Sequence, residues 1–363
     1  MPQHLDSNAP GGAPIRVGLI GFGVAGSVFH APLIASTSGL QLAKVVTASP
    51  ERAEQARGRY PEVTVVASAE ALWEQAGSLD LVVVAAPNDT HVPLAHAALA
   101  AGLPVVVDKP LCATVEEGHR LIEDARRRRL LLTVFQNRRW DGDFLTLQQL
   151  LAEGALGQVW RFESRFERWR PVPKPGWRQR GGSGEAGGLL YDLGSHLIDQ
   201  ALVLFGPVRQ VYAELERRYP GAQVDDDSFV ALTHCSGLRS HLWMSALAAQ
   251  LGPRLRVLGS TGGYTKYGLD PQEDALRAGG RPDQPSWGVE PAERWGMLGS
   301  GDDLRPLPTL AGAYPSFYEG VVAALRNAAP PPVAAADSLA VLEVIEAARR
   351  SAARGQTVTL DAA

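Results

Sequence analysis

The segment LLYDLGSHLID carries polar side chains that could do acid–base chemistry. Asp192, His196 and Asp199 are separated by four and three residues, which places them along one face of a predicted helix. An imidazole titrates near physiological pH, so His196 could accept the proton of a hydroxyl group while a neighbouring carboxylate fixes its tautomer. Gly187 and Gly188 would let the preceding loop approach a substrate closely. The alternative is a surface helix with an ordinary Asp–His pair.

A lysine stands at the end of an apolar run elsewhere in the chain. Lys109 follows the valines at 105–107 and lies between Asp108 and Pro110. Open parallel sheets bind their ligands at the carboxyl ends of the strands. An ammonium group there could polarise a carbonyl or hold a hydroxyl group, and desolvation would lower its pKa. A lysine that points into solvent is the alternative.

A glycine motif suggests which cofactor such chemistry would use. Gly21, Gly23 and Gly26 form G-x-G-x-x-G between a predicted strand at 15–20 and a predicted helix. The first glycine permits a tight turn, the second lets backbone amides approach a pyrophosphate, and the third allows close packing of helix on strand. The intervening residues complete the predicted dinucleotide site: Phe22, Val24 and Ala25. A glycine-rich turn without a ligand is the alternative.

The end of the second predicted strand bears on the choice between NADP and NAD. An acidic residue there would accept hydrogen bonds from the adenosine ribose and repel a 2′-phosphate. This chain has Thr47 and Ser49 instead, with no acid before Glu51, and Lys44 or Arg52 could supply a charge-assisted contact. NADP is therefore favoured over NAD. Thr47 and Ser49 could alternatively serve only as turn and helix caps.

The predicted strands and helices that must position these residues follow one another in two different patterns along the chain. Up to about residue 135, apolar strands alternate with helical patterns, which predicts a doubly wound parallel sheet. Beyond it come a helix, a strand, a second helix and then strands without intervening helices, which predicts an α+β domain with an antiparallel or mixed sheet. Residues 270–310 are rich in Gly, Pro and charge and are interpreted as surface loop, and closing helices are predicted at 314–328 and 338–355.

Composition excludes several other classes of protein. The chain is 45% hydrophobic, and its net charge of −4 does not favour binding to nucleic acid or to an anionic membrane. No segment approaches the apolar length of a membrane span, and residues 1–14 are interpreted as a loose tail. Cys112 and Cys235 form no metal-ligand spacing and are interpreted as free thiols of a reducing compartment. We expect a cytoplasmic protein without a bound metal.

The motifs together resemble a known family. GFGVAGSVFHAPLI at 21–34, AAPNDTH at 85–91, VVVDKP at 105–110 and GGLLYDLGSHLID at 187–199 are similar to the family of glucose–fructose oxidoreductase, inositol 2-dehydrogenase and the rhizopine protein MocA. Asp-Lys-Pro in place of Glu-Lys-Pro, with FQNRRWDGDF at 135–144, resembles its NADP-dependent scyllo-inositol dehydrogenase branch. The resemblance implies a Rossmann domain at 15–135 and a substrate-binding and oligomerisation domain at 136–363.

The resemblance also implies roles for particular residues. Pro87, Asn88 and His91 would border the nicotinamide end of the cofactor, and the catalytic group would be Lys109, Asp192 and His196. The Lys109–Pro110 peptide would be cis. From the residues alone, Asn137, Arg138 and Trp140 could line the substrate cleft, and Tyr191 and the loop 165–180 could cover it. Core or surface packing is the alternative for each of them.

The sequence thus predicts a hydride transfer between NADP(H) and a hydroxyl or keto group of a cyclic polyol or sugar. The resemblance also implies that the second domain carries a large, mostly antiparallel open sheet and that copies of the chain associate through this sheet. Two alternatives remain open. One is a non-catalytic dinucleotide-binding regulator, which would not need Lys109 and His196. The other is an enzyme that uses a tightly held cofactor for glycoside cleavage.

Overall fold

The N-terminal domain is the predicted doubly wound sheet. The computed structural model describes residues 12–173 and 186–360. Its six parallel strands run in the order β3-β2-β1-β4-β5-β6. Their bounds are β1 Ile15–Ile20, β2 Leu40–Val46, β3 Thr64–Val66, β4 Leu81–Val84, β5 Val105–Asp108 and β6 Leu132–Phe135. The central strands are almost wholly apolar because helices cover both faces of this sheet.

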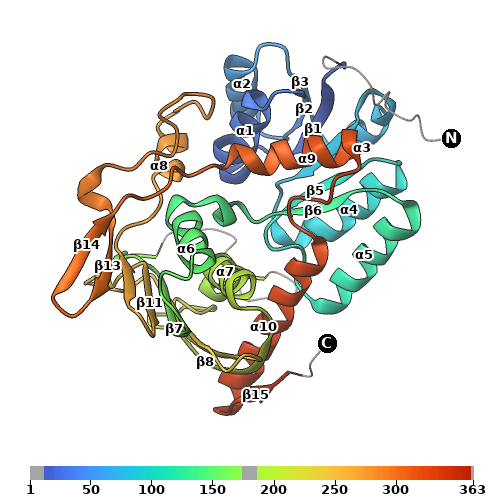
Figure 1. The fold of residues 1–363 in the computed structure, drawn as a ribbon. Helices are drawn as coiled ribbons and strands as arrows, with labels where there is room; N and C mark the ends of the chain where they lie inside the picture. The colour runs from blue at the N-terminus through green and yellow to red at the C-terminus, as the bar shows by residue number, and fades with distance from the viewer. Residues whose placement is uncertain (1–11, 174–185, 361–363) are drawn as a thin grey trace.

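Helices connect these strands and lie on the two faces of the sheet (Figure 1). They are η1 Ala25–His30, α1 Ala31–Ser36, α2 Pro50–Arg59, α3 Ala69–Trp73, η2 Ala76–Ser78, η3 Asn88–Thr90, α4 His91–Ala100 and α5 Val115–Arg128. The order of the strands reverses between β1 and β4, so the loops after these two strands open the crevice where such sheets bind ligands.

The second domain is built on a nine-stranded sheet in the order β14-β13-β12-β11-β7-β10-β9-β8-β15. Strands β7 and β10 are parallel, and the other neighbouring pairs are antiparallel, which confirms the expected mixed sheet. The bounds are β7 Val159–Glu167, β8 Val208–Glu216, β9 Asp227–His234, β10 Arg239–Ser245, β11 Leu255–Gly259, β12 Gly263–Lys266, β13 Gly296–Ser300, β14 Asp303–Leu307 and β15 Val358–Thr359.

The remaining helices are η4 Asn137–Trp140, α6 Gly142–Ala152, η6 Leu190–Gly194, α7 Ser195–Phe205, α8 Gln272–Arg277, η7 Ala292–Arg294, α9 Pro315–Asn327 and α10 Ala335–Arg354. Of these, α7 and α10 pack on one face of the large sheet, and α9 lies along the first domain (Figure 1). The two helices predicted near the C-terminus are therefore confirmed as α9 and α10. No helix in the described ranges is long and apolar enough to cross a membrane.

The interpretation of residues 270–310 as surface loop was wrong. This stretch contains α8 and the hairpin β13–β14, which extends the sheet, and it buries Asp270, Gln272 and Glu290. Charge and glycine suggested exposure, but these polar groups find partners inside the protein. The side chain of Lys266, for example, donates to Glu290 at 2.9 Å although both are almost fully buried.

The C-terminal helices return to the first domain. Helix α9 packs against α1. Helix α10 runs from the first domain to the edge of the large sheet that β8 and β15 form (Figure 1). The ring of Phe317 lies 4.9 Å from that of Phe135, edge to face. Tyr318 and His30 share a hydrogen bond of 2.6 Å between the phenol oxygen and Nδ1. The last part of the chain therefore completes the core around the end of β6.

Candidate active site

The three motif glycines occupy different surroundings, and these match the three roles expected of them. Gly21 has φ +96°, and a Cβ there would lie 2.4 Å from the carbonyl oxygen of Ala85. A Cβ at Gly26 would lie 2.0 Å from the carbonyl oxygen of Gly21. A Cβ at Gly23 would have no atom within 4 Å. The turn is thus closed on its protein side and open beside Gly23, which fits a cradle for a pyrophosphate.

The residues between these glycines also lie partly on the protein side of the turn and partly on its open side. Phe22 is buried in the core, Ala25 begins η1 and packs against the core, and the side chain of Val24 is 49% exposed. Ser27 donates its hydroxyl proton to the carbonyl oxygen of Gly23 at 2.8 Å, which fixes the turn. Val24 therefore lies on the open side of the turn, where a dinucleotide would pass.

At the end of β2, the hydroxyl groups act as caps. Thr47 Oγ1 accepts a hydrogen bond from the amide of Ser49, and Ser49 Oγ accepts one from the amide of Arg52, both at 3.3 Å. Lys44 donates to Gln75 Oε1 at 2.6 Å and so has a protein partner. Arg52 is exposed at the start of α2, so its side chain is the cation best placed to reach a ligand there.

Lys109 joins the two domains at the carboxyl end of β5. Its Nζ donates to the carbonyl oxygen of Asp192 at 2.6 Å and to Asp192 Oδ1 at 3.0 Å. The peptide between Lys109 and Pro110 is cis, as expected. The structure thus brings together Lys109 and Asp192, which lie far apart in the sequence.

His196 lies at the start of α7, where it is almost fully buried. Its Nδ1 has no hydrogen-bond partner among the residues described. Burial, together with the nearby positive charges of Lys109 and Arg138, holds the pKa of His196 well below its ordinary value. The imidazole is therefore neutral near pH 7 and can accept a proton.

The expected line of three polar groups on one helix face was only partly right. Asp192 lies in η6, a π-helical turn whose spacing is wider than that of the α-helix assumed from the pattern. Asp192 pairs with Lys109, and Asp199 pairs with Arg139 through two hydrogen bonds of 2.7 and 2.9 Å. The Asp199 carboxylate is thus committed to a guanidinium group and not to His196.

The AAPNDTH residues hold the loops around Lys109 in place. His91 is fully buried, and its two ring nitrogens lie 2.8 Å and 3.0 Å from the carbonyl oxygens of Pro110 and Ala86. Burial lowers the pKa of His91. Asn88 donates to the carbonyl oxygen of Ala186 at 3.3 Å, and the carbonyl oxygen of Pro87 accepts the hydroxyl proton of Thr90. Both ring nitrogens of His91 thus face backbone carbonyl oxygens, and the neutral ring donates to one of the two through its single N–H.

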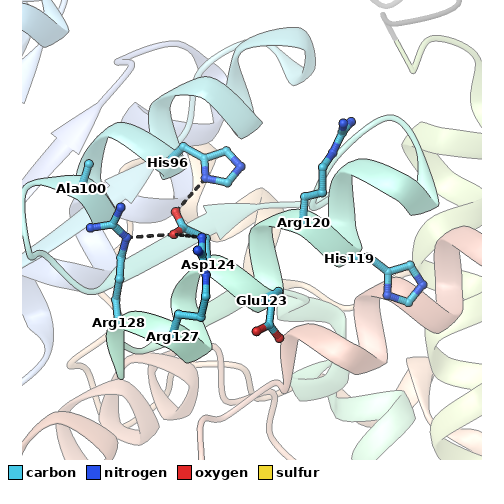
Figure 2. Close-up of a pocket in the computed structure, with 8 residues that line it drawn as sticks. All are labelled: His96, Ala100, His119, Arg120, Glu123, Asp124, Arg127 and Arg128. Atoms are coloured by element: carbon cyan, nitrogen blue, oxygen red, sulfur yellow. Dashed lines mark hydrogen bonds and ion pairs between the residues drawn. The ribbon is translucent and has the colours of Figure 1, made fainter.

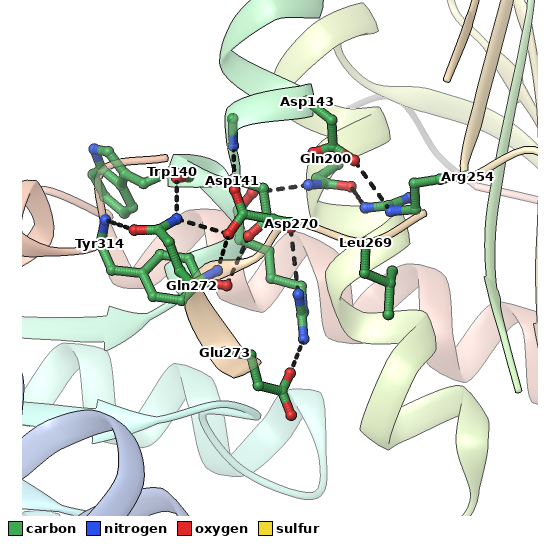
Figure 3. Close-up of polar contacts among 12 residues, drawn as sticks. Trp140, Asp141, Asp143, Gln200, Arg254, Leu269, Asp270, Gln272, Glu273 and Tyr314 are labelled. Carbon is green, nitrogen blue, oxygen red and sulfur yellow. Dashed lines mark hydrogen bonds and ion pairs between the residues drawn. The ribbon is translucent and has the colours of Figure 1, made fainter. Parts of the chain in front are cut away.

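The residues after β6 enter an internal polar network (Figure 3). Arg138 pairs with Glu273 at 2.6 Å and with Asp141 at 3.4 Å. Asn137 is buried beside it. Trp140 packs edge to face on Phe317, with ring centroids 5.8 Å apart. These side chains contact protein groups here, and Trp140 belongs to the core between η4 and α9.

Two further expectations concern the approach to η6. Tyr191 donates its hydroxyl proton to the carbonyl oxygen of Ala113 at 3.1 Å and accepts a hydrogen bond from Arg349. Gly188 has φ +91°, and a Cβ there would lie 2.0 Å from Asp225 Oδ1. The close approach that the structure shows for this glycine is to the carboxylate that binds the amide of Leu190, and the approach of this loop to a substrate stays a prediction.

Several polar groups in this region were not found from the sequence. Asp108 Oδ1 lies 3.5 Å from Nε2 of His30, the last residue of η1. Burial alone would raise the pKa of Asp108, but the contact with His30 lowers it. Arg168 directly follows β7, and its charge interacts with Asp192 in η6 and His196 in α7. From the sequence, Arg168 is included only as part of the loop 165–180, which is expected to cover the cleft. Residues 174–180 of that loop lie outside the described ranges.

A hollow of about 680 Å³ lies elsewhere, between α4 and α5 (Figure 2). Asp124 is central to it and binds His96 Nδ1 at 2.9 Å, Arg127 at 3.0 Å and Arg128 at 2.9 Å. None of the residues predicted from the motifs lines this hollow. It is therefore separate from the candidate active site.

Comparison with known proteins agrees with this arrangement. Residues 15–136 match the family described as oxidoreductase family, NAD-binding Rossmann fold, and residues 148–360 match its C-terminal alpha/beta domain. The chain is 44% identical to the uncharacterized oxidoreductase YdgJ of Escherichia coli K12, over 95% of this chain and 99% of that protein. It is 36% identical to scyllo-inositol 2-dehydrogenase (NADP(+)) IolW of Bacillus subtilis 168, over 96% of each.

A solved structure superposes on nearly the whole chain. The YvaA protein of Bacillus subtilis does so with a TM-score of 0.90 and 36% sequence identity, covering 96% of this chain and 99% of that one. Both domains and their connection are thus shared with these relatives. The chain belongs to the Gfo/Idh/MocA family of oxidoreductases, with an NAD-binding Rossmann domain followed by that family's C-terminal alpha/beta domain.

Proposed function

We propose that this oxidoreductase transfers a hydride between NADP(H) and a hydroxyl or keto group of a cyclic polyol or sugar. The observation that carries the proposal is the meeting of Lys109, held by Asp192, with a neutral, buried His196 beside the domain that bears the glycine turn. The relative IolW, named as an NADP-dependent scyllo-inositol 2-dehydrogenase, supports the choice of substrate class.

The bound nicotinamide would accept or supply the hydride, and the protein's own groups would handle the proton and the oxygen. In the oxidation, Lys109 hydrogen-bonds the hydroxyl oxygen and stabilises the negative charge that grows on it. His196 takes the hydroxyl proton as the hydride leaves the carbon. Asp192 fixes the lysine by accepting two hydrogen bonds from it. In the reverse direction His196 returns the proton to the carbonyl oxygen.

Cofactor preference is the first test of the proposal. We expect NADPH to bind more tightly than NADH because Arg52 is exposed at the end of β2 and no acid precedes Glu51. Replacing Arg52 with Ala should weaken NADPH binding roughly tenfold and leave NADH binding unchanged, since only NADPH carries the 2′-phosphate. Titration by nucleotide fluorescence measures both affinities. Equal or tighter binding of NADH by the unaltered protein would contradict the assignment.

A substrate screen tests the activity itself. Inositols, aldoses and their keto forms should be assayed in both directions with each nucleotide, and we expect turnover of at least one polyol or sugar. Binding of nucleotide without any turnover would instead indicate a regulator. Nucleotide that stays bound through purification, with glycoside cleavage and no net consumption of NADPH, would indicate the third alternative.

We also propose that copies of the chain associate through the uncovered face of the nine-stranded sheet. Phe229, His241 and Trp243 form an aromatic cluster on that face, with the Phe229 and Trp243 rings 5.1 Å apart and Arg165 over Trp243. Replacing Phe229 with Glu should shift the protein toward monomer, measured by light scattering after size exclusion. A monomeric unaltered protein, or an unchanged oligomer of the variant, would contradict this.

A further inference from the structure

Arg168 lies at the edge of the candidate active site, and none of the carboxylates in the described residues forms an ion pair with it. It follows β7 directly, and its backbone amide donates to the carbonyl oxygen of Ser245, so it continues the pairing of β7 with β10. Its side chain is partly buried, and its guanidinium carbon lies 4.8 Å from the centre of the Phe166 ring. Among the residues that the structure describes, it makes no ion pair and no side-chain hydrogen bond.

The neighbouring arginines show how unusual this is for the region. Arg138 pairs with Glu273 and Asp141, Arg139 pairs with Asp199, and Arg165 pairs with Glu163. Arg254 donates to Ser164 and Gln200. Each of these guanidinium groups has a partner that compensates for its burial, as partly desolvated charges require. Arg168 has none of this kind.

The strand geometry directs Arg168 toward the catalytic group. Side chains alternate along β7, and Phe162 and Phe166 point into the core on the face that α7 covers. Arg168 lies two residues after Phe166 and so shares that face. The guanidinium groups of Arg138 and Arg168 both lie within 5 Å of the Phe166 ring centre, at 4.6 and 4.8 Å. The charge of Arg168 also contributes to lowering the pKa of His196.

The carboxylates near Arg168 are already engaged by other cations. Asp192 Oδ1 accepts a hydrogen bond from Lys109, and Glu273 binds Arg138 and Arg277. Burial and the nearby cation Arg170 lower the pKa of Arg168, and the charges of Glu273 and Asp192 offset only part of this effect. An anion bound from solution would relieve this imbalance.

We propose that Arg168 binds an anionic group on the substrate, so that the preferred substrate is a sugar or polyol bearing a carboxylate or a phosphate. The inference rests on the proposed function and narrows its substrate class. A guanidinium group presents parallel N–H donors that match two oxygens of either anion. The reacting hydroxyl group would then be held at one end by Lys109 and His196 and the anion at the other by Arg168.

The test compares substrates that share one skeleton. D-glucose, D-glucuronate and D-glucose 6-phosphate are assayed with NADP and the intact protein, and the corresponding binding is followed by nucleotide fluorescence. We expect kcat/KM to be higher for one of the two anions than for glucose by roughly tenfold or more. The better of them distinguishes a carboxylate from a phosphate site. In Arg168→Gln this preference should be lost, and Arg168→Lys should retain part of it.

Arg161→Gln provides the matched control. Arg161 lies on the same strand with its side chain on the opposite face, where it pairs with Glu163 at 3.2 Å. This variant also loses one positive charge, and it should keep the preference for the anion. An equal loss in both variants would indicate a general effect of charge and would overturn the assignment of Arg168.

The remaining outcomes separate the two proposals. Turnover of glucose and both anions at similar rates, or an unchanged preference in Arg168→Gln, overturns the anion site and leaves the proposed function intact. If no compound is turned over, the proposed function is in doubt, and binding alone decides the anion site. Saturable binding of glucuronate or glucose 6-phosphate by the unaltered protein and by Arg161→Gln, but not by Arg168→Gln, then supports it. Equal binding by all three proteins, or no binding, overturns it.

Discussion

At the level of single residues, charge around His196 decides which form of the imidazole is present. Lys109 and the arginines nearby disfavour a second positive charge, and burial adds to their effect. A histidine in solution is half protonated near pH 6.5. His196 should stay neutral below that pH, so it is ready to accept a proton over the whole physiological range.

Replacing His196 with Ala should lower turnover by roughly 10²–10⁴-fold, the usual scale for a positioned proton-transfer group. NADPH affinity should change little because the cofactor cradle lies in the first domain. The matched control is His119→Ala, an exposed histidine on α5, which should behave as the unaltered protein. The measurements are steady-state kinetics with a deuterated substrate and nucleotide titration. Retained turnover, with an isotope effect showing that hydride transfer limits the rate, would make His196 structural.

The family motifs place Lys109 and Asp192 in one group, and the structure pairs these two side chains. Their roles in catalysis stay predictions. The sequence could not predict what Arg138 contacts, because Glu273 lies 135 residues away and no spacing links the two. The same holds for Tyr191, whose hydroxyl is bound by Ala113 and Arg349 from distant elements.

At the level of elements, the turn between β1 and η1 separates residues that shape the fold from residues that meet a ligand. Gly26 lets η1 pack directly on the turn, because even one carbon atom there would clash with the carbonyl oxygen of Gly21. Gly23 has no such neighbour. The two positions therefore allow folding and cofactor binding to be tested separately.

Gly26→Ala should destabilise the protein by about 1–3 kcal/mol, the usual cost of overpacking. Gly23→Ala should change the stability by less than about 0.5 kcal/mol, as a substitution into open space does. The same Gly23→Ala variant should nevertheless bind NADPH roughly tenfold more weakly, since its methyl group occupies the cradle. Chemical denaturation and nucleotide titration measure the two effects. If Gly23→Ala bound NADPH normally, the pyrophosphate would have to lie elsewhere.

The elements were predictable wherever hydrophobic periodicity was clear, as in β4, β5 and α10. The hairpin β13–β14 was missed because the exposed positions of β14 give it no apolar alternation to read. Its place in the sheet is fixed because β13 pairs with β12, which belongs to a predicted strand region, and β14 pairs with β13. Tertiary context decided the structure of this region.

At the level of the whole molecule, buried carboxyl groups connect the segment after β6 to the segment around α8 (Figure 3). Asp270 accepts hydrogen bonds from the amides of Gly142 and Gln272 at 2.7 and 2.8 Å. Asp141 accepts the hydroxyl proton of Tyr314 at 2.7 Å. Burial raises the pKa of Asp270 to about 6 and that of Asp141 to about 8. The folded protein therefore holds protons here that the unfolded chain would release.

This arrangement predicts that stability falls as the pH rises through the neutral range. The contribution of Asp270 is fully present below its ordinary pKa of 3.8 and is lost as the pH rises through about 6. At ~1.4 kcal/mol per pH unit, the contribution of Asp270 corresponds to about 3 kcal/mol. Urea denaturation between pH 4 and pH 8 measures it. Asp270→Asn cannot titrate and should show a flatter profile; an equally steep profile would assign the dependence to other groups.

The return of α9 and α10 to the first domain has a consequence for how the protein is made. A ribosome releases the chain from the N-terminus, so the Rossmann strands emerge long before Phe317 and Tyr318. Until then, Phe135 and His30 lack the rings that cover them in the finished protein. The nascent first domain thus exposes an apolar surface that is covered only when α9 has been synthesised. The core of the first domain is therefore completed only after synthesis of α9. A chain that ended before α9 would leave this apolar surface open to proteases and chaperones.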